Sequence, residues 1–65
     1  MVNNNLSGVR KDKGLTQEEL AEKSGISRVT IANIERGAVT NLKISTMLSL
    51  ANALDSTVEE IFLPR

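Results

Sequence analysis

The chain has 65 residues with eight Lys and Arg and eight Asp and Glu, so its formal net charge is zero, and it contains neither Cys nor His. Cys and His supply disulfides, the usual zinc sites and most nucleophile–base pairs, so we expect no cofactor and no enzymatic activity. A single domain of this size has a marginal core, which leaves a partner subunit as the remaining source of added stability.

Start and stop signals predict two helices in the first part of the chain. The first carries a stripe of residues at helical spacing: Leu6, Val9, Arg10 and Lys13. Gly14 follows this stripe and provides a C-terminal stop. Residues 16–19 then read Thr-Gln-Glu-Glu, a capping box that satisfies free amides at the start of a second helix. We expect this helix to run to about Ser24, with Leu20 and Ala21 facing inward.

A third helix is predicted only a few residues further on. Gly25 tolerates left-handed dihedral angles, and Ser27 can cap the helix that follows it. This helix carries Ile31 and Ile34 inward and stops at Gly37. Two helices joined by a Gly-containing turn of about three residues are typical of a helix-turn-helix, whose second helix enters the DNA major groove. A plain helical bundle with a tight Gly turn would have the same spacing.

Two further helices complete the expected fold. After a polar loop at 38–42, a fourth helix is predicted from a broad apolar face: Ile44, Met47, Leu48, Ala51 and Leu54. Residues 57–60 form a second capping box and open a short fifth helix that Pro64 ends. No window alternates polar and apolar residues long enough to demand a strand. We therefore expect one all-α domain over residues 1–65, a compact bundle of five short helices.

A specific pattern runs through the predicted second and third helices: GLTQEELA at 14–21, GIS at 25–27 and IANIERG at 31–37. It continues as LSLANAL at 48–54 and EEIF at 59–62. Together these stretches closely resemble the Cro/phage-repressor (XRE) family of helix-turn-helix transcriptional regulators. The resemblance implies a lambda-repressor-like fold, a helix-turn-helix over about 16–36, and a sequence-specific DNA-binding regulator of a bacterium or phage, which we expect to be a cytoplasmic repressor.

Base-reading residues are expected on the third helix. A rotation of about 100° per residue places three side chains opposite Ile31 and Ile34: Val29, Asn33 and Arg36. Arg28 lies in the first turn, where such a helix meets base edges. Arg can pair with guanine, Asn with adenine, and a Val methyl can contact the thymine methyl. An ordinary solvated face is the alternative for the three polar residues.

Further DNA contacts are expected around the third helix. The resemblance implies that Gln17 contacts the DNA backbone or a base-contacting residue, and the amides of Thr16 and Gln17 at a positive helix end suit a phosphate. Capping alone is the alternative. Ser27 and Thr30 border the same surface, and Thr30 could serve a phosphate or the core. The resemblance also points to a backbone-gripping loop: Thr40, Asn41 and Lys43. Many relatives have Pro-Ser at 42–43, so a Ser cap is lost here, and Lys43 either contacts a phosphate or is simply solvated.

Arg10 and Glu35 are expected to form a structural ion pair. Arg10 lies on the inward stripe of the first helix, and Glu35 lies beside Ile31 on the inward edge of the third. The two periodicities predict a partly buried pair between these helices, and the family resemblance implies the same pair. We therefore assign Arg10 to the scaffold rather than to the DNA contacts.

Double-stranded DNA is the expected partner and a homodimer the expected assembly. Specific binding usually needs two half-sites about one helical turn apart, read by a two-fold dimer. The apolar residues near the C-terminus exceed what one short helix can bury, which predicts a dimer surface: Val58, Ile61, Phe62 and Leu63. Packing of Phe62 against Leu54 and Leu6 within one chain is an alternative. Extended termini at Val2 and Leu63 could also pair between subunits.

An acidic face is predicted on the outside of the second helix: Glu18, Glu19 and Glu22. Solubility explains it simply, but some phage repressors that the chain resembles contact RNA polymerase there. Within DNA binding, a restriction–modification controller or an antitoxin stays open. A protein-interaction module that kept the fold without reading DNA is a different class, which the neutral charge favours. No apolar run is long enough for a membrane span or a signal peptide, so no membrane contact is expected.

Overall fold

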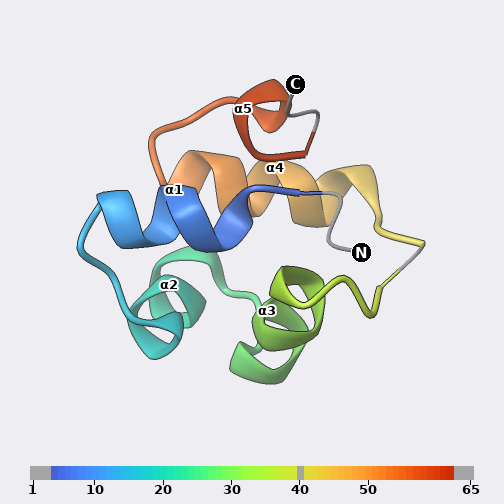
Figure 1. The fold of residues 1–65 in the computed structure, drawn as a ribbon, viewed down its shortest axis with the longest axis horizontal. Helices are drawn as coiled ribbons and strands as arrows, with labels where there is room; N and C mark the ends of the chain where they lie inside the picture. Colours follow the sequence, from blue (N-terminus) through green and yellow to red (C-terminus); the bar gives the residue numbers. More distant parts are fainter. Residues whose placement is uncertain (1–3, 40, 63–65) are drawn as a thin grey trace.

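The computed structural model describes residues 4–39 and 41–62, and within these ranges it contains five α-helices and no strand (Figure 1). The helices are α1 Leu6–Asp12, α2 Gln17–Ser24, α3 Arg28–Glu35, α4 Ile44–Ala53 and α5 Val58–Phe62. The expected all-α bundle of five short helices is confirmed. Four residues with predicted roles lie outside the described residues: Val2, Thr40, Leu63 and Pro64.

Side-chain caps explain why the helices begin where they do. At the start of α2, Thr16 Oγ1 accepts a hydrogen bond from Glu19 N at 3.1 Å, and Glu19 Oε1 accepts from Thr16 N at 2.8 Å. The same reciprocal box opens α5, where Thr57 and Glu60 bond each other's backbone N–H groups at 3.1 and 3.0 Å. Both boxes agree with the sequence, because each satisfies amides that the first helical turn leaves free.

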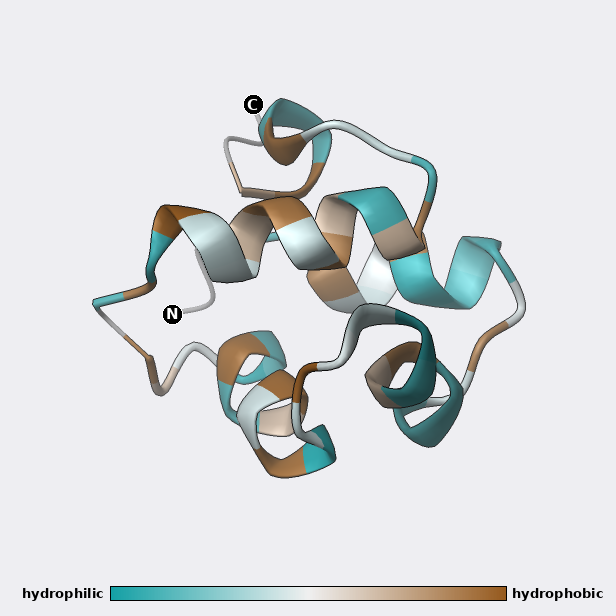
Figure 2. Cartoon of the chain, turned by 180° about the vertical axis from the view of Figure 1, so that it is seen from behind, coloured by the Kyte–Doolittle hydropathy of each residue, from teal (hydrophilic) through white to brown (hydrophobic). Residues whose placement is uncertain are grey.

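The core is formed by apolar residues from all five helices: Leu6, Leu20, Ile31, Ile34, Leu50, Ala51, Leu54 and Ile61. α2 packs against α3 and α4, α4 packs against α5, and α1 contacts α3 and α5. Figure 2 shows hydrophobic and hydrophilic bands alternating along the helices, as expected for helices that each bury one side. None of the described helices is both long and apolar enough to cross a membrane.

The buried side of α4 differs from the prediction. Ile44 and Leu48 were expected inward, but their exposed fractions are 65% and 48%, whereas Leu50 is fully buried. The core stripe of α4 therefore passes through Leu50, Ala51 and Leu54. α4 is apolar around much of its circumference, so periodicity alone could not choose between two adjacent stripes. Packing against α2 and α5 makes that choice.

Candidate nucleic-acid interface

A tight turn joins α2 to α3. Gly25 has φ +76° and ψ +10°, the left-handed conformation that a glycine adopts without a steric cost, and its N–H bonds Ala21 O at 2.9 Å. Ser24 Oγ donates to Leu20 O at 2.7 Å and accepts from Ile26 N at 3.1 Å, which fixes the path of the chain through the turn. Ser27 then caps α3 by accepting from Thr30 N at 3.3 Å. Residues 17–35 thus form two short helices separated by three residues.

The outer side of α3 carries the predicted base readers. Arg28 and Arg36 are exposed, Val29 is 61% exposed and Asn33 is half-buried. Ile31 and Ile34 on the opposite side are buried in the core, as expected. Asn33 and Arg36 also bond each other, because Asn33 Oδ1 accepts from Arg36 Nε at 3.2 Å and from Arg36 Nη2 at 2.8 Å. The interaction between these two side chains was not foreseen from the sequence.

The C-terminal end of α3 is closed by a Schellman arrangement. Gly37, at φ +75°, follows the last helical turn and donates from its N–H to Ile34 O at 3.0 Å. Ala38 N donates to Asn33 O at 2.9 Å. These two bonds satisfy carbonyls that the helix end would otherwise leave free, and they fix the backbone beneath Asn33 and Arg36.

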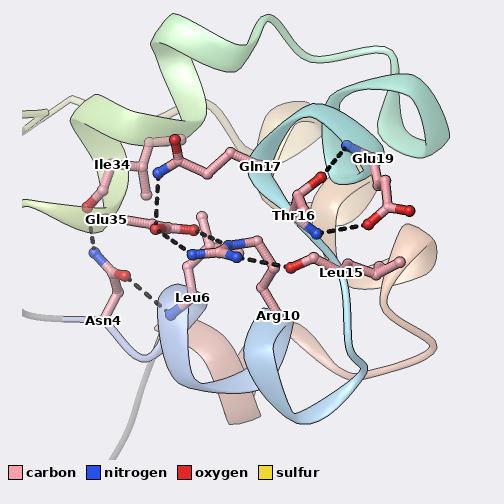
Figure 3. A network of polar contacts seen from close by, with 9 residues as sticks. All are labelled: Asn4, Leu6, Arg10, Leu15, Thr16, Gln17, Glu19, Ile34 and Glu35. Atoms are coloured by element: carbon pink, nitrogen blue, oxygen red, sulfur yellow. Dashed lines mark hydrogen bonds and ion pairs between the residues drawn. The ribbon is translucent and has the colours of Figure 1, made fainter.

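Asn4 holds the same end of α3 from a distant part of the chain. Its Nδ2 donates to Ile34 O at 2.9 Å, and its Oδ1 accepts from Leu6 N at 3.1 Å (Figure 3). This role of Asn4 was not expected from the sequence. Asn just before a helix favours a capping function, but nothing in the sequence indicates a partner 30 positions away.

The expected ion pair between α1 and α3 is present and belongs to a larger network (Figure 3). Arg10, 9% exposed, bonds Glu35 through two nitrogens, with Nε 2.7 Å from Oε2 and Nη2 3.1 Å from Oε1. Its Nη1 donates to Leu15 O at 2.7 Å, and Gln17 Nε2 donates to Glu35 Oε1 at 3.1 Å. One guanidinium therefore ties α1, the segment before α2, and α3 together.

The ionisation of this pair follows from its surroundings. The hydrogen bond to Glu35 raises the pKa of Arg10 and outweighs the opposite effect of burial. Burial by itself would raise the pKa of Glu35, but hydrogen bonds from Arg10 and Gln17 and the nearby positive charges hold that pKa below its ordinary value. Both groups are therefore charged at neutral pH, and the carboxylate of α3 is neutralised within the protein.

The remaining predicted DNA contacts lie around α3. Thr16, Ser27, Asn41 and Lys43 are exposed, and Thr30 is half-buried. Gln17 does not cap α2 with its side chain, since that side chain bonds Glu35. Lys43 makes no side-chain cap at the start of α4, which agrees with the loss of a Ser at this position. Phosphate contacts by these residues stay predictions.

The predicted dimer surface on α5 requires a correction. Ile61 is fully buried in the core of the single chain and is not available to a partner, so its assignment was wrong. Val58 and Phe62 are half-buried and pack against the same core, as the alternative for Phe62 foresaw. Among the described residues outside α3, the most exposed large apolar side chains are instead those of Ile44 and Leu48 on α4.

The acidic face of α2 is exposed but not uniform. Glu18, Glu19 and Glu22 all face solvent, yet Glu19 is engaged with Thr16 in the capping box. Of these three residues, only Glu18 and Glu22 take no part in capping α2. A contact with RNA polymerase at this face stays a prediction.

Two short helices joined at a three-residue turn, with an outward polar face on the second, define a helix-turn-helix protein. The model of the helix-turn-helix family matches residues 8–61, and the chain belongs to this family.

Several relatives share most of this fold. The chain is 38% identical to the uncharacterised HTH-type transcriptional regulator y4dJ of Sinorhizobium fredii over 98% of its own length and 82% of that protein. It is 33% identical to the regulator SinR of Bacillus subtilis, of which it spans only 55%. A crystal structure of SinR in complex with DNA superimposes with a TM-score of 0.82, 34% identity and coverage of 91% of this chain and 94% of that one.

A third relative is a restriction–modification controller. The structure of C.AhdI from Aeromonas hydrophila superimposes with a TM-score of 0.80 and 41% identity. The match covers 86% of this chain and 83% of C.AhdI.

Proposed function

We propose that the chain binds duplex DNA in a sequence-specific manner and acts as a transcriptional repressor, with α3 as the recognition helix in the major groove. The observation that carries this is the outer side of α3, where Arg28, Val29 and Arg36 are exposed on a helix held from behind by the core. Guanidinium groups and a methyl-bearing side chain are the groups that read base edges. The SinR structure, solved in complex with DNA, supports the same use of this fold.

The zero net charge of the whole chain does not describe the charge on the outer side of α3. Glu35 is the only carboxylate of α3, and Arg10 neutralises it inside the protein. The DNA-facing side of α3 is therefore locally positive. Glu59 and Glu60 belong to α5, which lies at the opposite end of the molecule from α2 and α3 (Figure 1). Arg28 and Arg36 therefore stand on this helix without an unpaired carboxylate of its own, which favours phosphate there even though the whole chain is neutral.

A homodimer on a palindromic site completes the proposal. Ile44 and Leu48 lie one helical turn apart on α4, immediately after the loop that leaves α3, and both are largely exposed. A two-fold contact through these residues would bury them and give the dimer two copies of α3. A palindromic site would require the two α3 helices to lie about 34 Å apart, one turn of DNA, and one copy is 24 Å across at its longest.

The test is selection of bound sequences from random duplex DNA, followed by affinity measurements over a range of salt concentrations. A reader of DNA enriches one palindromic sequence, and its affinity falls with salt in proportion to the phosphates neutralised. Arg28→Ala should weaken binding at the selected site by about tenfold or more, within the range of a base contact. The control is Glu59→Gln on α5, which removes an exposed charge far from α3 and should leave the affinity unchanged.

A protein-interaction module is the second candidate, favoured by the exposed apolar pair Ile44 and Leu48 and by the zero net charge. In that case the selection enriches no sequence. If a palindrome is enriched, its position in the genome separates a general repressor from a restriction–modification controller, which the similarity to C.AhdI supports.

A triple Glu18→Gln, Glu19→Gln and Glu22→Gln variant that binds its site but loses activation would identify a polymerase contact. We also infer that the protein is not an enzyme and that it acts in the bacterial cytoplasm, encoded by a bacterium or by a phage.

A further inference from the structure

Two of the proposed base readers are bonded to each other before any DNA is present. Asn33 and Arg36 lie three residues apart on the outer side of α3, and Asn33 Oδ1 accepts two hydrogen bonds, at 3.2 Å from Arg36 Nε and at 2.8 Å from Arg36 Nη2. Arg36 forms no ion pair with any described residue that would draw it elsewhere. The fork of the guanidinium is therefore directed at the amide oxygen of Asn33.

Chemistry dictates the orientation of the Asn33 amide in this contact. A guanidinium has N–H donors and no acceptor, so the amide must turn its oxygen towards Arg36 and its NH₂ group away. The oxygen has two lone-pair directions, and Nε and Nη2 each use one. Both side chains then offer only N–H donors to a ligand.

The contact stands on a rigid part of the helix. Asn33 is half-buried, and its backbone oxygen accepts from Ala38 N at 2.9 Å. Arg36 is the C-cap residue of α3, and its own N–H bonds Ala32 O at 3.2 Å. The two Cα positions are thus fixed relative to each other, so only the two side chains have to be ordered for this contact to form.

We propose that Asn33 and Arg36 read DNA as one donor-only unit and select guanine at the base pair that Asn33 faces. Adenine needs an acceptor for its N6 amino group as well as a donor for N7, and in this unit no acceptor is free. Guanine presents two acceptors, N7 and O6, which a donor-only pair satisfies. The ordinary pairing of Asn with adenine is thereby excluded. This inference rests on the proposed DNA-binding function.

The experiment compares selected sites for four versions of the protein. Asn33→Ala identifies the base pair that Asn33 reads, since discrimination is lost there and kept elsewhere. Arg36→Met removes the donors but keeps the length of the stem, which frees the amide oxygen of Asn33. Arg28→Met is the matched control, because it removes the same charge from the same side of α3 without touching Asn33. Thermal unfolding of each variant verifies that it is folded.

We expect the wild type to prefer guanine over adenine by about tenfold or more at the position that Asn33→Ala identifies. Arg36→Met should lose this preference or admit adenine, whereas Arg28→Met should keep it. A wild-type preference for adenine there, an unchanged guanine preference in Arg36→Met, or no position affected by Asn33→Ala overturns the inference while leaving DNA binding intact. If the wild type enriches no sequence at all, the proposed function itself fails.

Discussion

Arg10 Nε lies 2.7 Å from Glu35 Oε2, and this contact joins the last turn of α3 to α1. Both side chains are close to buried, and the remaining polar atoms of the pair are bonded to Leu15 O and Gln17 Nε2. The pair fixes the position of α3 in two directions, against α1 and against the start of α2. A helix only eight residues long depends on such tertiary contacts, because isolated short helices are not stable in water.

Removing one partner of this pair should lower the free energy of unfolding far more than replacing both partners with apolar residues. Arg10→Ala leaves the carboxylate of Glu35 with only Gln17 as a partner, and we expect a loss of about 3 kcal/mol in the free energy of unfolding. Arg10→Met combined with Glu35→Leu removes both charges and fills the space with apolar groups, so it should recover most of that loss. Urea denaturation measures both values. Equal stability of wild type and Arg10→Ala would show that the pair is not structural.

The same pair makes stability depend on pH. The pKa of Glu35 is lower in the folded protein than its ordinary value of 4.5, so the folded state binds this proton less tightly than the unfolded state does. The stabilisation is therefore complete well above pH 4.5 and is lost as the pH falls through the folded pKa. Glu35→Gln should be less stable than wild type at pH 7, and the difference should shrink on acidification. A difference that stays constant from pH 7 to pH 3, measured by urea denaturation, would contradict the prediction.

The sequence predicted those parts of the fold that depend on local chemistry. The capping boxes at Thr16 and Thr57 and the turn at Gly25 follow from short patterns. The ion pair of Arg10 with Glu35 is not local, and it was predicted from the periodicity of two helices together with the family resemblance. The orientation of α4 could not be predicted in the same way. α4 presents more apolar residues than one side can bury, and only the packing of α2 and α5 decides that Leu50 is inside.

The candidate site could likewise be predicted only in part from the sequence. Helical rotation predicted which residues of α3 face outward, because their placement follows from Ile31 and Ile34 being buried. It did not predict that Asn33 and Arg36 bond each other, since that depends on rotamers, or that Asn4 reaches Ile34. The contact between Asn33 and Arg36, on which the proposed base specificity rests, is thus one that required the structure.

Replacing the exposed apolar pair on α4 should abolish dimer formation. Ile44→Glu combined with Leu48→Glu places like charges at the proposed two-fold contact, while the fold should persist because both side chains are exposed in the monomer. We expect a monomer in sedimentation and a loss of about 100-fold or more in affinity for the palindromic site, since the second half-site no longer helps the first. Phe62→Ser is the comparison for a dimer through α5, and because Phe62 packs against the core, its thermal unfolding must first show that it stays folded. Loss of the dimer in Phe62→Ser alone would move the interface there.

A backbone substitution at the end of α4 should stabilise the protein. Asp55 has φ +52° and occupies the position after the C-cap, where its N–H bonds Asn52 O at 3.1 Å and the next N–H bonds Ala51 O at 2.9 Å. This is the Schellman geometry that glycine adopts without strain, whereas any residue with a Cβ pays a steric cost. Asp55→Gly relieves that cost but gives the unfolded chain more freedom, so we expect a net gain of about 0.5 kcal/mol.

Gly25→Ala is the matched control for Asp55→Gly, because it makes the reverse change at a turn residue whose dihedral angles lie in the same left-handed region. Gly25, at φ +76°, has no atom within 4 Å of an added Cβ, so Gly25→Ala introduces backbone strain without a collision. It should destabilise the protein by about 1 kcal/mol. Thermal unfolding of the two variants should therefore shift the midpoint in opposite directions. Shifts of the same sign would mean that contacts of the Asp55 side chain, rather than its backbone conformation, determine the stability of this turn.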